Sequence, residues 1–177
     1  LSSAASDVYK RQTNGIRLSQ FDEVTKEILT LKEIQKLAVT SCPNNEVKRA
    51  FLFSCYCGLR WCDVYQLRYK DVDFPARRLT IIQQKVQTHS KSAILHLNLN
   101  HTALKLLQKC NGDREDLVFS LPSYSYTIRI LRKWVIDANI RKHITFHCAR
   151  HSFITNIMAN GANIKTAASL AGHSTTR

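Results

Sequence analysis

Apolar residues recur every three or four positions along most of this chain, and this period predicts α-helices. Helices are expected over the segments 30–38, 45–58, 61–71, 101–110, 125–140, 145–161 and 163–172. Several of these segments end at a glycine, as at Gly58, Gly161 and Gly172, and glycine is common just after a helix C-terminus. The chain is therefore expected to be mostly helical.

Two segments have a different period. In residues 78–86 and 92–100 apolar and polar residues alternate, most clearly at Leu95, Leu97 and Leu99. The polar residues between these segments are typical of a turn, which predicts an antiparallel pair of strands. The expected fold class is α+β, mostly helical, with a small antiparallel sheet.

The first helix has a clear start signal. Thr30 can cap it, and Glu33 three residues later completes a capping box. The residues expected to point inward are Leu31, Ile34, Leu37 and Ala38 in this helix, and Ile128, Leu131, Val135 and Ile136 in the helix over 125–140.

The charge balance indicates a partner. There are 26 Lys and Arg against 13 Asp and Glu, a net charge of +13. A domain this basic usually binds a polyanion, and nucleic acid is the first candidate. No apolar run approaches the ~20 residues that cross a membrane. The first residues lack the apolar stretch of a secretory signal, so a cytoplasmic protein without membrane contact is expected.

Six cysteines are expected to be reduced thiols packed as small apolar groups. Three of them, Cys55, Cys57 and Cys62, lie close together in the sequence. Their spacing, Cys-x-Cys-x4-Cys, matches no common zinc site. A zinc knuckle is therefore the weaker interpretation.

The two ends differ from the rest of the chain. Residues 1–12 look like the translation of a sequencing-library adapter with a transposase end, so we exclude them from the fold. Residues 13–29 have no clear period and are expected to be an inter-domain linker. Residues 30–177 are expected to form one domain that is truncated at its C-terminus.

Histidines at four-residue spacing raise the question of a metal. His143, His147 and His151 could share one helix face, and two histidines at this spacing can hold zinc. Zinc hydrolases of this type also need a carboxylate beside the first histidine, where this chain has Cys148. No metal or cofactor is therefore expected.

A phosphate fits the same residues better. His147 and Arg150 share a face near a helix N-terminus, where free N–H groups and the helix dipole favour an anion. Arg60 comes two residues after Gly58, at a helix break, and His173 follows Gly172. Two arginines and two histidines from separate segments could meet at one phosphate and stabilise a phosphorane without a metal. His151 is expected behind them.

Two stretches carry a resemblance to a known family. Residues 50–74, AFLFSCYCGLRWCDVYQLRYKDVDF, resemble the first conserved box of the tyrosine recombinase (phage integrase) family. Residues 143–176, with His-x-x-Arg-His followed by Gly-His-Ser, resemble its second box. The resemblance extends from about residue 29 to the last residue, and it implies the DNA breaking-rejoining catalytic fold of that family.

The resemblance also implies a reaction. The family cuts DNA with a tyrosine that attacks a phosphate, leaving a 3′-phosphotyrosyl link and a free 5′-OH. It implies that Arg60 and Arg150 hold the non-bridging oxygens, that His147 assists proton transfer and that His173 hydrogen-bonds the phosphate. The implied activity is site-specific DNA recombination or integration, the chemistry of a DNA strand transferase.

Two further roles follow from the resemblance. A lysine in the turn between the strands would protonate the leaving 5′-oxygen. Lys85 is favoured over Lys91 because it directly follows the first strand, as the family's lysine does. Asp63 and His151 would support the site without touching the reacting atoms.

The chain departs from the family in one important respect. The nucleophilic tyrosine should follow His173 by a short distance, but the chain ends at Arg177 and its last tyrosine is Tyr126. The fragment is therefore expected to bind DNA and not to cleave it. A family member would act on double-stranded DNA as a homotetramer, here in a bacterial cytoplasm and at the nucleoid. The alternatives are a non-catalytic DNA-binding relic and, less favoured, a type IB topoisomerase.

Overall fold

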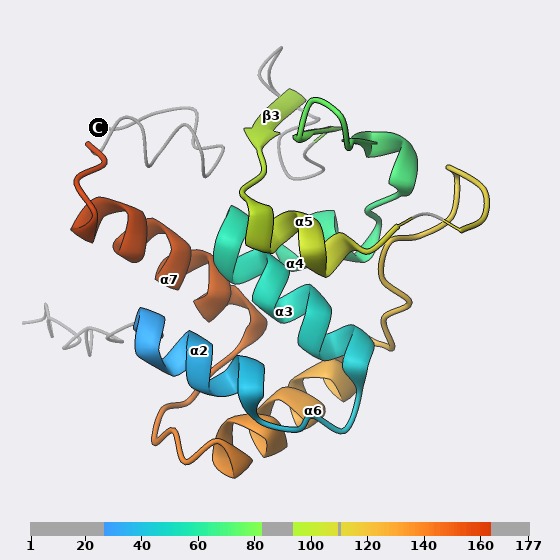
Figure 1. Ribbon diagram of the computed structural model, residues 1–177. Helices are drawn as coiled ribbons and strands as arrows, with labels where there is room; N and C mark the ends of the chain where they lie inside the picture. Colours follow the sequence, from blue (N-terminus) through green and yellow to red (C-terminus); the bar gives the residue numbers. More distant parts are fainter. Residues whose placement is uncertain (1–26, 83–93, 110, 164–177) are drawn as a thin grey trace, which may run out of the picture.

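The computed structural model describes residues 27–82, 94–109 and 111–163 (Figure 1). The helices are α2 (Leu31–Val39), α3 (Asn45–Cys57), α4 (Trp61–Tyr65), the 3-10 helix η1 (Tyr69–Asp71), α5 (His101–Leu107), α6 (Tyr124–Asp137) and α7 (Phe146–Ala159). The strands are β1 (Val72–Asp73), β2 (Arg78–Ile82) and β3 (Ile94–Asn98). Mostly helical α+β architecture is thus confirmed.

Helix α3 lies at the centre of the domain, with α2, α5, α6 and α7 around it (Figure 1). Its middle is apolar on all sides, which is typical of a helix with neighbours all round it. Phe51 packs edge-on against Trp134 of α6, 6.0 Å between ring centroids, and against Phe146 of α7 at 5.7 Å. These ring contacts join α6 and α7 to the same point on α3.

The predicted helix ends are confirmed at α2 and α3. Thr30 accepts a hydrogen bond from the Glu33 backbone, and the Glu33 carboxylate accepts one from the Thr30 backbone, which completes the capping box. Gly58 ends α3 with a positive φ of 71°. Its amide donates to the Ser54 carbonyl at 2.8 Å.

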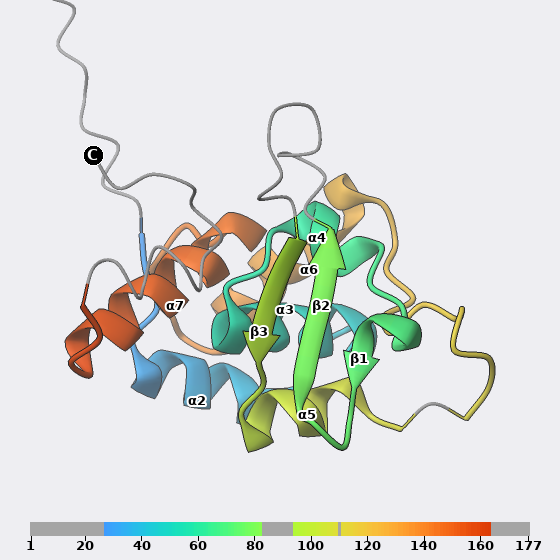
Figure 2. The ribbon, with the colours of Figure 1, turned by 90° about the horizontal axis from the view of Figure 1, so that it is seen from above.

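The sheet has the strand order β1–β2–β3, with both pairs antiparallel (Figure 2). In β2 and β3 buried and exposed residues alternate, and Leu79 lies opposite Leu97 on the buried face. The antiparallel pair predicted from the sequence is therefore confirmed. The short strand β1 was not predicted.

The helix predicted over 61–71 is wrong in its second half. Helix α4 ends at Tyr65, and η1 and β1 follow instead. The backbone there pairs with a distant segment: the Val118 amide donates to the Leu67 carbonyl, and the Tyr69 amide donates to the Asp116 carbonyl. These long-range bonds compete with the helical ones, and no local pattern could have predicted them.

The inward faces predicted for two helices were partly wrong. Ile34 and Leu37 are buried in α2, but Leu31 is 46% exposed and Ala38 is exposed as well. In α6 Ile136 is 70% exposed, and Trp134 occupies the core position beside it. In each helix, fewer of the predicted apolar residues face the core than the sequence pattern suggested.

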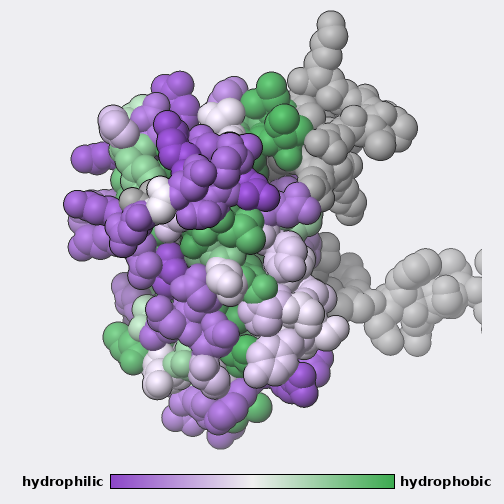
Figure 3. Space-filling model, turned by 90° about the vertical axis from the view of Figure 1, so that its right-hand side faces the viewer, coloured by the Kyte–Doolittle hydropathy of each residue, from purple (hydrophilic) through white to green (hydrophobic). Residues whose placement is uncertain are grey.

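The surface in Figure 3 is largely hydrophilic, with smaller apolar patches between charged side chains. Among the described residues, no helix is long and apolar enough to span a membrane. The helix predicted over 163–172 and the turn between the two strands lie outside the described residues.

Candidate active site

Side chains of α3 and α7 fix the conformation of the turn from α3 to α4. A Cβ atom on Gly58 would lie 2.4 Å from the Phe153 ring of α7, so only glycine fits there. The Ser54 hydroxyl donates to the Leu59 carbonyl at 2.7 Å. Arg60 follows at once as the N-cap residue of α4, so its position is set by this turn.

Arg150 reaches from α7 to the same turn. Its side chain is only 2% exposed, and its Nη1 donates to the Gly58 carbonyl at 2.7 Å. The helix that carries His147 and the turn that carries Arg60 are thereby joined through a guanidinium. This contact brings together two segments that lie 92 residues apart in sequence.

The two arginines repel each other. Burial and, to a smaller extent, the charge of Arg60 lower the pKa of Arg150 to about 10, while Asp63 acts in the opposite direction. Arg60 Nη1 is buried and has no hydrogen-bond partner among the described residues. A buried donor of this kind beside a second guanidinium is suited to an incoming anion.

Asp63 lies in the first turn of α4 and is 6% exposed. Its carboxylate lies close enough to Arg150 to favour the charged form of that guanidinium. It is the acid that balances part of the positive charge, and its burial suits a supporting role rather than contact with a ligand.

The histidines separate into different positions. His147 is exposed in the first turn of α7, and its ring lies 4.4 Å from the partly buried ring of His151, nearly perpendicular to it. His143 precedes the helix, and its Nε2 atom lies 3.4 Å from Nη2 of Arg132 in α6. The three histidines therefore do not share one helix face, and no group of metal-ligating side chains occurs in the described part of the chain.

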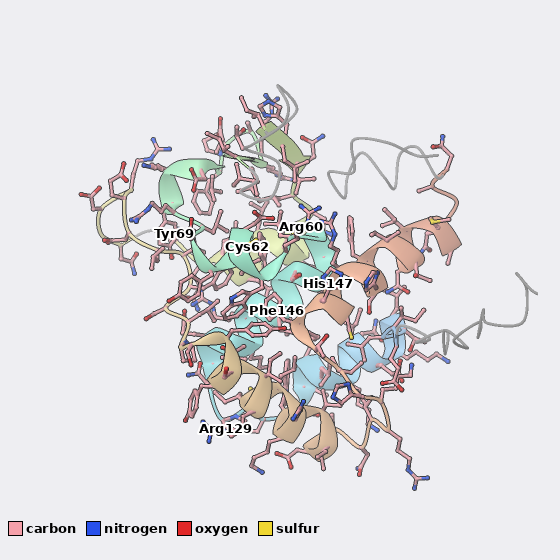
Figure 4. The ribbon with its side chains drawn as sticks, turned by 180° about the vertical axis from the view of Figure 1, so that it is seen from behind. Arg60, Cys62, Tyr69, Arg129, Phe146 and His147 are labelled. Atoms are coloured by element: carbon pink, nitrogen blue, oxygen red, sulfur yellow. The ribbon has the colours of Figure 1, made fainter. Side chains whose placement is uncertain are left out.

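Figure 4 shows Arg60 and His147 near each other, where α4 meets the start of α7. The residues next to them in sequence are in contact, because the ring centroids of Trp61 and Phe146 lie 5.0 Å apart. The predicted residues Arg60, His147 and Arg150 thus come together, with Asp63 and His151 beside them. Such a cluster can bind an anion and stabilise additional negative charge on it.

Three predicted site residues, Lys85, Lys91 and His173, lie outside the described residues. The sequence also missed residues that shape the site: Ser54 and Phe153 fix the α3–α4 turn, and Trp61 packs behind it. Only the adjacency of Trp61 to Arg60 could have indicated a role. The contacts of Ser54 and Phe153 depend on tertiary packing alone.

Comparison with known proteins gives the same picture. Residues 27–177 match the phage integrase family. A tyrosine recombinase of Pseudothermotoga lettingae is 31% identical over 166 residues, covering 90% of this chain and 57% of that protein. Tyrosine recombinase XerD of Staphylococcus haemolyticus is 37% identical over 179 residues, covering 93% and 60%. The chain thus spans somewhat more than half the length of these relatives.

Solved structures share the fold. The Tn1549 transposon integrase, in complex with transposon right end DNA, superposes with a TM-score of 0.71 at 19% identity, covering 96% of this chain and 68% of that one. The XerA recombinase superposes with a TM-score of 0.67 at 20% identity, covering 84% and 57%. The family match over residues 27–177 and the relatives of 31% and 37% identity show that the chain belongs to the phage integrase family.

Proposed function

We propose that this chain carries the catalytic domain of a site-specific DNA recombinase, which cleaves and rejoins DNA through a 3′-phosphotyrosyl intermediate. The observation that carries the proposal is the pair Arg60 and Arg150. The buried Arg150 guanidinium is held against the α3–α4 turn although Arg60 lowers its pKa. Such repulsion costs stability, and a bound phosphate would relieve it.

The reaction balances without a cofactor. A tyrosine oxygen attacks the phosphorus, the bond to the 5′-oxygen breaks, and that oxygen takes a proton. Arg60 and Arg150 would stabilise the negative charge on the non-bridging oxygens, and His147 would move a proton near the nucleophile. Asp63 and His151 would support these groups. Lys85, with Lys91 as its alternative, would supply the proton to the 5′-oxygen, and His173 would bind the phosphate.

The proposed partner is double-stranded DNA, which the net charge of +13 favours. The relatives named tyrosine recombinase and the Tn1549 integrase complex with DNA support this partner. We also propose assembly as a homotetramer on DNA in the cytoplasm, at the nucleoid. If phosphates dominate binding, the affinity for duplex DNA should fall steeply as salt concentration rises.

The test measures DNA cleavage and DNA binding separately. The source DNA is first read past the Arg177 codon, and a protein that includes the encoded tyrosine is given a nicked duplex that traps the covalent intermediate. Arg150→Ala should reduce covalent complex formation about 100- to 1000-fold while changing duplex affinity only a few-fold. Arg141→Ala, which removes an exposed arginine outside the site, is the control.

Other outcomes would change the conclusion. Equal losses of cleavage and binding would show that Arg150 only contacts the DNA backbone and takes no part in the reaction. Duplex binding without any covalent complex in the extended protein would favour a DNA-binding relic. Relaxation of supercoiled DNA without a specific site would favour a type IB topoisomerase.

A further inference from the structure

Three aromatic rings pack together beside Arg60, two from α4 and one from the start of α6. Trp61 lies 5.4 Å from Tyr65 and 5.2 Å from Tyr124 between ring centroids. We refer to Trp61, Tyr65 and Tyr124 as the aromatic platform. Tyr126, two residues after Tyr124 in α6, instead lies under the Arg129 guanidinium, 4.8 Å from its ring centroid, and is not part of the platform.

The platform is accessible to a ligand. Tyr65 is 40% exposed and Tyr124 is 45% exposed. Large aromatic side chains usually lose most of their surface on folding, so two half-exposed tyrosines in contact through one tryptophan are unusual in a structural cluster. Trp61 itself is anchored to the core, because its ring packs against Phe146 at 5.0 Å.

The platform is continuous with the phosphate site. Trp61 directly follows Arg60, and Phe146, which Trp61 contacts, directly precedes His147. Figure 4 shows Arg60 and His147 at this junction, with Arg129 farther along α6. A DNA strand with its phosphate at Arg60 and Arg150 would therefore present its neighbouring bases toward the rings.

We propose that the aromatic platform stacks unpaired nucleobases of a DNA strand held at the phosphate site. The inference rests on the proposed function and adds a second binding element to it. Exposed rings interleaved with arginine are the usual means of holding single-stranded nucleic acid, because every base has a face on which a ring can stack.

Paired DNA cannot use this platform in the same way, since its base faces are covered by their neighbours in the stack. The platform would therefore act when bases near the cleaved phosphate separate, which strand exchange between two sites requires. It would hold the released strand and leave the affinity for intact duplex nearly unchanged.

The experiment compares three probes with the 177-residue chain: a short oligothymidylate, an abasic oligonucleotide of the same length, and a duplex. The abasic probe has the phosphates without the bases, so it measures the electrostatic contribution alone. Binding is followed by tryptophan fluorescence. Trp134 is fully buried, so quenching on binding reports Trp61, the other tryptophan of the chain.

The oligothymidylate should bind roughly tenfold more tightly than the abasic probe and should quench Trp61. The double variant Tyr65→Leu and Tyr124→Leu should lose this difference, while the matched variant Tyr65→Phe and Tyr124→Phe should retain it because the rings remain. Duplex affinity should agree within about twofold among all three proteins. Thermal unfolding confirms that each variant is folded.

Equal affinity of the wild-type chain for the oligothymidylate and the abasic probe would overturn the proposal. An equal loss of duplex binding in the leucine variant would overturn it too, since the face would then contact paired DNA. These failures differ from failure of the proposed function, in which the duplex itself would not bind with a steep dependence on salt.

Discussion

Two buried arginines in this domain have opposite surroundings. Arg49 of α3 is 8% exposed, and its Nε and Nη2 donate to the carbonyls of Leu106 and Leu107, each at 3.1 Å. Its Nη1 forms an ion pair with Glu46, and its guanidinium lies over the Phe119 ring. The charge of Arg49 is thus balanced, and its donors hold the end of α5.

Arg150 is buried even more deeply but faces a like charge. It donates to the Gly58 carbonyl, and both burial and Arg60 lower its pKa. The charge of Arg49 is balanced by Glu46 and by carbonyl acceptors, whereas the charge of Arg150 lies beside a second guanidinium and is offset by Asp63. The comparison therefore distinguishes an arginine with a balanced charge from one beside a like charge, which is the arginine that we propose binds the phosphate.

The largest effect is expected from Arg49→Leu. It leaves two helix-end carbonyls and Glu46 without their donor in a largely buried place, so the free energy of unfolding should fall by about 3 kcal/mol. Urea unfolding measures this loss. Arg49→Lys keeps the charge beside Glu46 but cannot serve both carbonyls, so it should lose an intermediate amount. Arg141→Leu, which removes an exposed arginine, is the reference. A smaller loss for Arg49→Leu than for Arg141→Leu would contradict a stabilising role of Arg49.

Gly58→Ala should disturb Arg150 without removing it. The new methyl group would meet the Phe153 ring in addition to adopting a positive φ, so unfolding free energy should fall by about 2–3 kcal/mol. Gly161→Ala is the matched control, because its φ is also positive at 93° but nothing lies within 4 Å. It should lose about 1 kcal/mol. Equal losses for Gly58→Ala and Gly161→Ala in urea unfolding would mean that the Phe153 ring moves aside at little energetic cost.

Arg150→Leu should lower the free energy of unfolding by less than Arg49→Leu does, by about 1–2 kcal/mol. The variant loses the bond to the Gly58 carbonyl and the charge beside the buried Asp63 carboxylate, but it also removes a desolvated charge beside Arg60. The same urea titration, run beside Arg49→Leu, provides the comparison. A loss as large as that of Arg49→Leu would show that Arg150 is mainly structural.

The smallest effect concerns Cys57, whose thiol lies near Arg150. Burial raises the pKa of Cys57 from 9.0 to about 12, although the charge of Arg150 lowers it. The neutral thiol therefore contributes stability below the pKa of the unfolded chain, and this contribution is lost as pH rises toward 12.

Between pH 8.5 and pH 9.5 the Cys57 contribution should fall by about 0.7 kcal/mol, and Cys57→Ala should remove this part of the decline. Urea unfolding at the two pH values measures it. In Arg150→Leu the pKa of Cys57 should rise further, so its alkylation at fixed alkaline pH should slow. An unchanged pH dependence in Cys57→Ala would show that the thiol is not shielded from water.

Local signals determined the helix starts and the site residues. The Thr30–Glu33 capping box and the stop at Gly58 need only neighbouring residues, so the sequence predicted them correctly. The three-residue spacing of His147 and Arg150 placed them in one helix, and the helix break at Gly58 made Arg60 a candidate before the resemblance gave it a role. The positions of Lys85 and His173 stay predictions.

Tertiary packing decided the rest. The chain leaves the helix after Tyr65 because its backbone pairs with residues near 116–118, which no local pattern reveals. Burial of Arg150 and its bond to Gly58 depend on how α7 crosses the α3–α4 turn. The sequence by itself determined which residue types are available to bind a phosphate. Only the folded chain placed two like charges together, because packing of distant segments sets the distances on which their repulsion depends.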